Sequence, residues 1–394
     1  MPAQLRIVDG PAGGTVQVTL RNRPSATAGQ VCFATSRTPP FATTLTLAVP
    51  GNGAPVDLFL AGVFGRPSRA DRDATIEAVD AATNQQLSVT RLMVRVRKDA
   101  VSLTNAERYR FVEALAALND RGMGTFSDFP SMHRDLGLDQ AHGNSGFLPW
   151  HRAMLLDLER ELQAIDPTVA LPYWKFDVKA KGMLTKAYLG TPDASGAVTF
   201  EPGHPLESWV TDSVPGLLRT EGFDAETDPA FVQSEATTLN RGTPGFAYTS
   251  FRQMEGDPHG LAHTSFTGFI RDPQTAARDP LFFLLHCNVD RLWAKWQWLR
   301  DRFDVTQGTS YPPQGAGAAP VGHNLEDTLW PWNGETAPQH PGRPDTAPGG
   351  SFPPSALTAA PGPTPKVKDM IDHRGVKDPA TWLGFDYDDV PFDV

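Results

Sequence analysis

The sequence is poor in cysteine, with only Cys32 and Cys287 among its 394 residues. Two cysteines so far apart exclude the disulfide framework on which small secreted domains depend. They also argue against a metal site built from thiolates. Any metal site in this chain must therefore use histidine imidazoles or carboxylates.

Long basic runs and long apolar runs are also absent. The formal net charge is -10, whereas a nucleic-acid-binding domain carries a clustered basic surface. No stretch approaches the roughly 18 apolar residues of a membrane-spanning helix. The N-terminus (MPAQLRIVDGPAGG) lacks the basic start and apolar run of a secretion signal. We therefore expect no nucleic-acid partner, no membrane partner, and a protein that is cytoplasmic or exported without a recognisable signal of its own.

The first part of the chain has the alternating pattern of β-strands. Apolar and polar residues alternate at 16–20, 44–49, 74–79 and 91–96, and Gly, Pro, Asn and Asp separate these stretches. This spacing is typical of a small all-β sandwich. A chain of this length is expected to form two or three domains, of which the sandwich is the first.

A helical pattern replaces the strand pattern near residue 100. Thr104 and Glu107 have the Thr-x-x-Glu spacing of a capping box, and apolar residues then recur at helical spacing. Two further helices are predicted, one from Pro149 to about Ile165 and one from Pro280 to about Arg300. Aromatic and aliphatic residues dominate both, so we expect them to be buried.

Proline, glycine, alanine and threonine crowd the chain from about Tyr311 to Pro365. Such a segment is expected to be extended and to hold no core. The aromatic residues of the last stretch, 382–394, predict that it docks back onto the rest of the protein. The sequence thus predicts a β-sandwich domain at 1–98, a mainly α domain at 99–310, and a Pro-rich extended segment with a docking tail at 311–394.

Six of the ten histidines fall into two groups of three. The first group is His133, His142 and His151, and the second is His259, His263 and His286. Residues i and i+4 of a helix lie on one face, so His259 and His263 can point at the same metal ion. His286 can complete this set from the predicted helix that contains it.

A pair of histidines four residues apart is weak evidence by itself, because short motifs recur by chance. Their surroundings strengthen it, since His151 and His286 lie in apolar runs that would bury their rings. A buried imidazole needs partners for its ring nitrogens, and a metal ion satisfies one of them. The sequence therefore predicts two metal sites of three histidines each.

The type of ligand narrows the choice of metal. Imidazole triads without thiolate or carboxylate suit copper, zinc, iron or nickel, whereas magnesium and calcium prefer oxygen ligands. A mononuclear zinc hydrolase stays open, but residues 259–263 (HGLAH) lack the glutamate that follows the first histidine of metalloprotease helices. Two neutral triads favour a pair of coppers, since each ion can then cycle between +1 and +2 without extra fixed charge.

Three segments resemble the copper-binding regions of the tyrosinase, catechol oxidase and hemocyanin family of type 3 copper proteins. They are residues 144–152 (NSGFLPWHR), 258–263 (PHGLAH) and 279–293 (DPLFFLLHCNVDRLW). The resemblance covers about residues 100–300 and implies a central four-helix bundle with a dicopper site that binds O2. It implies that one copper (CuA) is held by His133, His142 and His151, and the other (CuB) by His259, His263 and His286.

The resemblance also implies a reaction, the oxidation of an o-diphenol to an o-quinone while O2 is reduced to water. Tyrosinases additionally hydroxylate monophenols and so act as monooxygenases. Glu255 stands four residues before His259, where many members place a glutamate that orients a water beside the incoming phenol. Gly260 stands where efficient monophenol hydroxylases often have asparagine. We therefore expect a polyphenol oxidase that prefers diphenols, with monophenols and o-aminophenols as further substrate classes.

A hemocyanin-like O2-binding protein is the alternative function. Such a protein uses the same six ligands but blocks the access of organic substrates. Hemocyanins are large and often repeated chains, so one dicopper unit in 394 residues argues against this reading. Family members are often kept latent by an added domain, and here the β domain or the tail is expected to be able to block the site.

Residues next to the triads carry two further expectations. Asp290, one turn beyond His286, is expected either to accept a hydrogen bond from a ligand imidazole or to form an ion pair with Arg152 or Arg291. Phe269 is the expected aromatic residue near the copper mouth. The histidines outside the triads are expected to be solvent or loop residues; they are His204, His323, His340 and His373.

Overall fold

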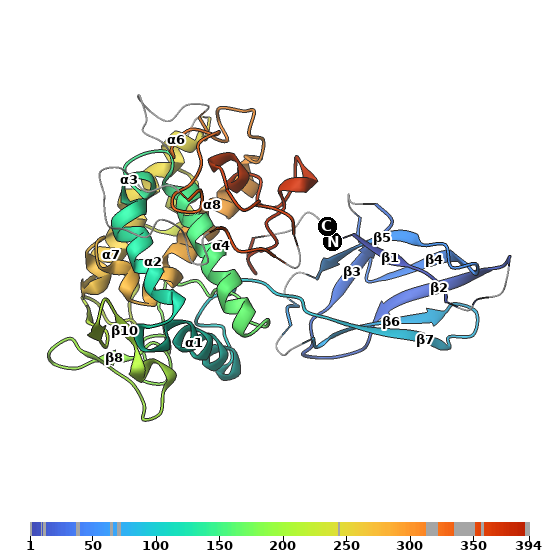
Figure 1. Cartoon of the computed structure of the whole chain (residues 1–394), viewed down its shortest axis with the longest axis horizontal. Coiled ribbons are helices and arrows are strands. Elements are labelled where there is room, and N and C mark those ends of the chain that lie inside the picture. The colour runs from blue at the N-terminus through green and yellow to red at the C-terminus, as the bar shows by residue number, and fades with distance from the viewer. Residues whose placement is uncertain are drawn as a thin grey trace. The chain divides into compact units, whose positions relative to one another are not determined.

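The computed structural model of the chain divides into two compact units, one that ends at Val96 and one that runs from Arg97 to Val390. Figure 1 shows strands in the first unit and helices in the second. The structure describes residues 2–8, 10, 13–36, 40–63, 66–68, 72–242, 245–312, 322–334, 351–355 and 358–390.

The described part of the first unit contains two antiparallel sheets. The larger sheet has the strand order β4-β2-β6-β7, and the smaller has the order β1-β5-β3. The strands are β1 (Pro2–Leu5), β2 (Thr15–Asn22), β3 (Val31–Ala34), β4 (Thr44–Pro50), β5 (Val56–Gly62), β6 (Ala74–Asp80) and β7 (Gln86–Leu92).

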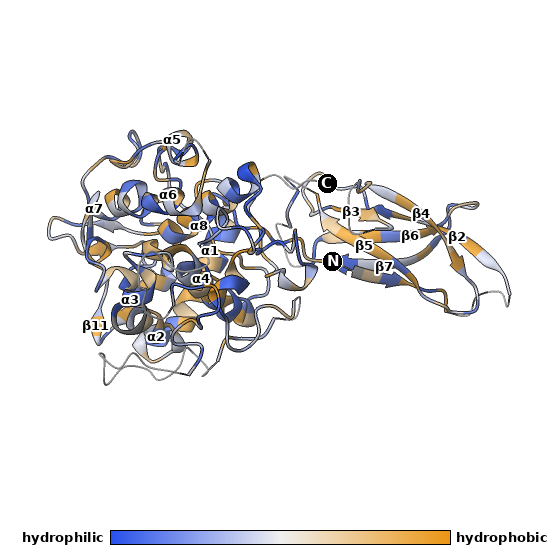
Figure 2. Ribbon diagram, turned by 90° about the horizontal axis from the view of Figure 1, so that it is seen from above, coloured by the Kyte–Doolittle hydropathy of each residue, from blue (hydrophilic) through white to orange (hydrophobic). Residues whose placement is uncertain are grey.

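Side chains from both sheets share one hydrophobic core. Val18 and Val49 come from the larger sheet, Phe33 and Leu60 come from the smaller, and all four are buried. Figure 2 shows hydrophobic and hydrophilic residues interleaved along these strands, as the period-two pattern requires. The predicted strand at 91–96 is displaced, because pairing with β6 ends β7 at Leu92.

The second unit centres on three long helices, α1 (Asn105–Asn119), α4 (Phe147–Ile165) and α8 (Leu281–Arg300). Helix α4 packs against both α1 and α8. The capping box at Thr104 is present, since its hydroxyl accepts from the Glu107 N–H and the Glu107 carboxylate accepts from the Thr104 N–H. The predicted helices are thus found to within two residues at their starts, whereas the four-helix bundle stays a prediction.

Short elements connect the long helices. The short helices are α2 (Asp128–Ser131), α3 (Leu138–Ala141), α5 (Glu235–Leu239), α6 (Tyr248–Phe251) and α7 (Leu261–Thr264). The short strands are β8 (Thr191–Pro192), β9 (Val198–Thr199), β10 (Val210–Thr211), β11 (Val214–Pro215), β12 (Arg219–Glu221) and β13 (Phe266–Gly268). Each pairs with its neighbour in that order, β8 with β9, β10 with β11 and β12 with β13.

The described part of residues 311–390 belongs to the same hydrophobic core as α4 and α8. Its buried core residues are Tyr311, Leu329, Trp332, Phe352, Val367, Met370, Ile371, Leu383, Phe385, Tyr387 and Val390. The expectation that residues 311–365 hold no core is wrong, because proline and glycine prevent long helices without preventing the burial of side chains such as Tyr311, Leu329, Trp332 and Phe352. The division into 1–98, 99–310 and 311–394 stays a proposal about sequence modules.

Helices long and apolar enough to cross a membrane are not found among the residues that the structure describes.

Candidate metal centre

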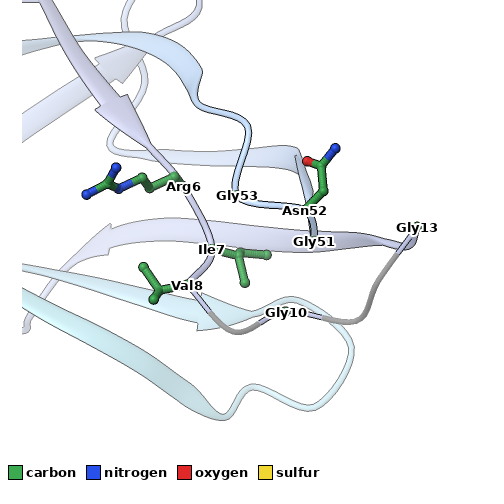
Figure 3. A pocket seen from close by; sticks show the side chains of 8 residues that line it. All are labelled: Arg6, Ile7, Val8, Gly10, Gly13, Gly51, Asn52 and Gly53. Carbon is green, nitrogen blue, oxygen red and sulfur yellow. The ribbon is translucent and has the colours of Figure 1, made fainter.

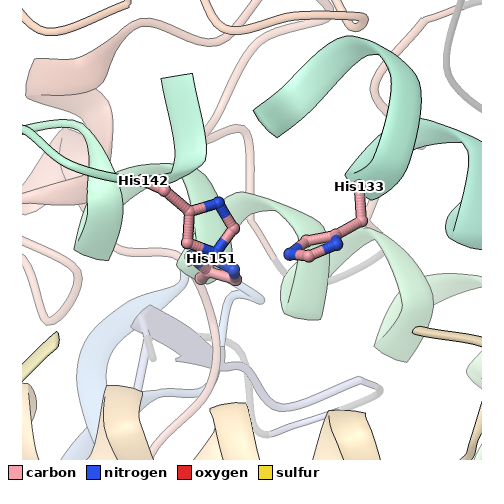
Figure 4. A group of neighbouring side chains, drawn as sticks. All are labelled: His133, His142 and His151. Carbon is pink, nitrogen blue, oxygen red and sulfur yellow. The ribbon is translucent and has the colours of Figure 1, made fainter. Parts of the chain in front are cut away.

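Each of the two histidine triads converges on a point. In the trio of His133, His142 and His151, and equally in the trio of His259, His263 and His286, one ligand atom per ring lies within 4.8 Å of the others. Figure 4 shows the first trio, with the three rings gathered between helical segments. No other group of three potential ligands was found in the described ranges.

The first triad is presented by three different segments. His133 lies in the short helical segment Met132–Gly137, and His142 directly follows α3. His151 lies on the second turn of α4, where its ring is almost fully buried. Two of the three ligands therefore depend on short, irregular structure rather than on a long helix.

The second triad is presented by two short helical segments and one long helix. His259 lies in the segment Gly256–Gly260 and His263 in the following helix α7, so the predicted spacing of one turn is kept. The ring centroids of His259 and His263 are 4.7 Å apart. His286 faces them from the middle of α8.

The packing of α4 on α8 brings the two triads side by side. The rings of His151 and His286 are stacked, with centroids 4.0 Å apart and an interplanar angle of 9°. His142 and His259 face each other more distantly, with ring centroids 6.3 Å apart. The six imidazoles thus form one cluster and not two separate sites.

Main-chain carbonyls fix four of the six rings. Nδ1 lies 2.9 Å from Pro273 O in His133, 2.8 Å from Phe147 O in His151, 2.7 Å from Glu255 O in His259, and 2.6 Å from Ile270 O in His263. A carbonyl oxygen only accepts, so each Nδ1 must carry the proton and donate it. Each neutral ring then presents the lone pair of Nε2 to the cluster.

The Nε2 atoms lack partners of the kind they need. Those of His133 and His151 are buried and have no hydrogen-bond partner within the chain. The Nε2 of His286 lies 3.3 Å from the Nε2 of both His259 and His263. If His286 carries its proton on Nε2, it can donate to only one of the other two nitrogens. A cation satisfies all of them, so the residues fit a pair of imidazole-bound metal ions.

Burial keeps these rings unprotonated near neutral pH. It lowers the pKa of His133, His151, His259 and His286 well below the usual value, and neighbouring imidazoles lower it further. Burial also lowers the pKa of His263 to about 4. A metal ion therefore has no proton to displace from these nitrogens at neutral pH.

Two phenylalanines pack against the triads. The ring centroid of Phe282 lies 4.2 Å from that of His286 and 4.8 Å from that of His133. Phe147 lies 4.8 Å from His259 and 5.0 Å from His151. Phe282 lies on the helix predicted from Pro280, and its burial agrees with the expectation for that helix, whereas Phe147 was not singled out from the sequence. Phe269 is the aromatic residue expected near the copper mouth. Its ring packs against the Arg278 guanidinium, whose Cζ lies 4.1 Å from the ring centroid.

Glu255 connects the two triads. Its backbone carbonyl holds His259, and its side-chain Oε1 accepts from the N–H of Gly143, which follows His142, at 2.7 Å. Its Oε2 pairs with Arg252 at 2.6 Å, and burial raises the pKa of this carboxyl. Gly260 lies nearby, and a Cβ added there would meet Glu255 O at 3.3 Å.

Asp290, one turn beyond His286 on α8, forms a buried ion-pair network. Its Oδ1 accepts from Arg152 at 2.6 Å, and its Oδ2 accepts from Arg97 at 3.1 Å and from the Tyr387 hydroxyl at 2.6 Å. Of the two expected roles, the structure has the ion pair with Arg152. Arg291, the other expected partner, pairs with Asp389 and Glu235 instead.

The described histidines outside the triads lie in loops, as expected, but two of them are not exposed to solvent. His323 and His373 are buried, at 1% and 0% exposure. His204 is half-buried and accepts from the Leu206 N–H. His340 lies outside the described residues. Sequence analysis missed the burial of His323 and His373 because the surrounding composition resembles a linker, although Leu329, Trp330 and Trp332 in the same segment are signals of packing.

An open depression on the surface of the first unit has no part in this site. It lies between turns of the strands, and its lining includes Arg6, Ile7, Asn52 and several glycines (Figure 3). The lining contains no histidine, cysteine or carboxylate, so it offers neither metal ligands nor an acid–base pair.

Residues 123–299 match the family model described as the common central domain of tyrosinase. The chain is 30% identical over 274 residues to the tyrosinase of Streptomyces antibioticus, an alignment that covers 61% of this chain and 94% of that protein. It is 31% identical to the tyrosinase of Streptomyces glaucescens, over 62% of this chain and 94% of that one. Among solved structures, a functional unit of octopus hemocyanin is similar, with a TM-score of 0.49, 19% identity, and coverage of 75% of this chain and 69% of that one.

Proposed function

This chain belongs to the tyrosinase family of type 3 copper oxidoreductases, and we propose that it is a polyphenol oxidase that converts o-diphenols to o-quinones with O2 as the oxidant. One observation carries the proposal: two trios of neutral, buried histidines lie against each other, with His151 stacked on His286. Such a donor set suits redox-active copper.

The six histidines are the proposed ligands. His133, His142 and His151 would hold one copper ion, and His259, His263 and His286 the other. Copper, when bound, supplies the exchange of electrons between the phenol and O2. The chain itself fixes the rings through their Nδ1–H bonds to main-chain carbonyls. Phe147 and Phe282 exclude water from the rings that they cover.

The proposed reaction balances with two diphenols for each O2. Each o-diphenol loses two electrons and two protons when it becomes an o-quinone. Two such molecules supply the four electrons and four protons that turn one O2 into two waters. Monophenols and o-aminophenols are the further substrate classes to be tested, since an o-aminophenol can lose two electrons and two protons in the same way.

Glu255 and Gly260 are proposed to shape the reaction at the substrate side. A carboxylate offers about four lone-pair sites, and Glu255 uses its oxygens on Gly143 and Arg252. The remaining sites are proposed to hold a water beside the incoming phenol. Gly260 supplies no side-chain amide to assist this water, so diphenol oxidation is expected to exceed monophenol hydroxylation.

Oxygen uptake by copper-loaded protein tests the function. An oxygen electrode and quinone absorbance would follow a panel of monophenols, o-diphenols and o-aminophenols, with the zinc-loaded protein as the matched redox-inert control. We expect one O2 to be consumed for two molecules of catechol with copper and none with zinc.

Two other outcomes would contradict the proposal. Reversible O2 binding without turnover, even after limited proteolysis, would favour the O2 carrier. One metal ion per chain and an activity independent of O2 would favour a zinc hydrolase.

A further inference from the structure

The loop that carries His142 is held by distant parts of the chain. It runs from α3 to α4 and has little regular structure of its own. The Gly143 N–H donates to Glu255, and the Tyr248 hydroxyl donates to Ser145 O at 2.6 Å. The Gly146 N–H donates to Nδ1 of His323 at 2.9 Å. Each anchor comes from a segment more than 100 residues further along the chain.

His323 bonds to both sides of this loop. Its Nδ1 accepts from Gly146 after His142, and its Nε2 lies 2.9 Å from Asp139 O before His142. A carbonyl only accepts, so Nε2 carries the ring proton and Nδ1 carries none. This is the opposite tautomer to that of the four triad rings fixed through Nδ1. Both nitrogens of His323 are therefore used by the backbone, and neither is left for a metal ion.

The surroundings of His323 hold its own position. The ring is 1% exposed, and its carbonyl accepts from the Tyr311 hydroxyl at 2.8 Å. Asp327 Oδ2 accepts from the consecutive N–H groups of Gly322, His323 and Asn324. This turn is thus rigid on its far side as well as on the side that faces the loop.

The contact between the two segments leaves no free space. A Cβ added at Gly146 would lie 2.5 Å from Gly322 O and 2.6 Å from His323 Nδ1. Gly322 has φ near +97°, and a Cβ there would lie 2.2 Å from the side chain of Gln140. The side-chain oxygen of Gln140 in turn accepts from the Trp330 N–H at 2.9 Å. Only glycine fits at both positions, so the segment 322–330 packs tightly against this loop.

We propose that His323 is a positioning residue for the first triad, in that its imidazole ties Asp139 to Gly146 and thereby sets where His142 presents its ligand nitrogen. The inference rests on the proposed function, because it assumes that the first triad binds copper. It assigns a role to a histidine that belongs to neither triad. Outer partners of this kind typically change metal affinity by about 10-fold to 100-fold.

The test compares variants of His323 that keep different bonds. His323→Leu removes both bonds, His323→Asn keeps an acceptor as many bonds from the backbone as Nδ1, and His323→Gln keeps a donor as far out as Nε2. His204→Leu is the matched control, because His204 also accepts a backbone N–H through Nδ1 but only within its own turn. Copper per chain would be measured during dialysis against a chelator of increasing strength.

We expect His323→Leu to lose one copper at a chelator strength at which the wild type and His204→Leu retain two. The single Cu(II) that remains should give an electron paramagnetic resonance signal, whereas a coupled pair gives none. The double variant His323→Leu/His142→Ala should lose no more copper than His142→Ala alone, which assigns the loss to the first triad. His323→Asn should recover more copper affinity than His323→Gln, because the Gly146 bond lies next to α4.

Hydrogen exchange of the copper-free protein gives a readout without metal or activity. The Gly146 amide should exchange more than about 10-fold faster in His323→Leu, while amides in the middle of α1 keep their protection. Unchanged exchange at Gly146, or full retention of both coppers in His323→Leu, would overturn the positioning role. A wild-type protein that binds fewer than two coppers overturns the proposed function instead, and the exchange result then still decides whether His323 holds the loop.

Discussion

The two triads are alike in composition but are held by different kinds of structure. One ligand of each triad lies on a long helix, His151 on α4 and His286 on the 20-residue α8. His259 and His263 lie four residues apart in short consecutive helical segments, and main-chain carbonyls four and seven residues away hold their rings. His142 follows a helix of four residues and depends on hydrogen bonds from residues more than 100 positions away.

This difference teaches that the geometry of the second triad is largely local, whereas that of the first is largely tertiary. The rings of His259 and His263 are held by carbonyls of their own segment, whereas the ring of His133 is held by the carbonyl of Pro273, 140 residues away. A ligand on a loop is placed only after distant segments have packed. We therefore expect changes remote in sequence to affect the first copper more than the second.

Removal of one proposed ligand from each triad should have the largest effect, and the effect should be alike for the two triads. We expect His142→Ala and His263→Ala each to lower oxidase turnover by more than about 100-fold, beyond the range typical of outer partners. Each should leave one copper per chain. Metal analysis and oxygen uptake provide the measurements, and a variant that kept two coppers and full turnover would show that its histidine is not a ligand.

Loss of Asp290 should act on the helix pair that carries His151 and His286. Asp290→Ala leaves Arg152 buried without a carboxylate partner, and removal of one member of a buried pair typically costs about 3–5 kcal/mol. The free energy of unfolding, followed through the thermal midpoint of the helical unit, should fall accordingly.

Glu326→Gln is the control for this prediction. Its pairs with Lys366 and Lys368 are exposed to solvent, so we expect the free energy of unfolding to change far less than in Asp290→Ala. Equal destabilisation by the two variants would contradict the structural importance of the buried network.

The contrast between local and tertiary structure also decides which features of the fold and the site could be predicted from the sequence. The two histidine triads, the capping box at Thr104 and the ends of α4 and α8 could be predicted, because each can be read from residue spacing along the chain. The burial of His323 and the packing of Phe147 on His259 were not, since both depend on segments that meet only in the folded chain. The predicted strand at 91–96 was displaced for the same reason, because its register is set by pairing with β6.

Two glycine substitutions sharpen the comparison at a smaller scale. Gly146→Ala places a Cβ within 2.6 Å of three atoms around the His142 loop, and overpacking of this kind costs about 1–3 kcal/mol. We expect it to lower the copper affinity of the first triad. Gly256→Ala, close to the second triad, meets no atom within 4 Å and should leave copper binding and stability unchanged. Chelator titration of both variants checks this, and equal loss of copper would contradict the difference between the triads.

The smallest expected effect concerns the substrate side of the second triad. Gly260 has φ of -61° in a helical region, so the backbone accepts asparagine there, although a Cβ lies 3.3 Å from Glu255 O and the helix must give slightly. Gly260→Asn adds a side-chain amide to the helical segment that follows Glu255, and we expect this amide to help hold the proposed water. We expect the ratio of monophenol hydroxylation to diphenol oxidation to rise by a few-fold, about 1 kcal/mol in relative barrier height. Gly260→Ala separates the steric effect from the amide, because it adds the Cβ alone. If both variants shift the ratio equally, or neither does, the Glu255 carboxylate does not act through a water that Gly260 leaves unassisted, and its role reduces to holding the His142 loop through Gly143.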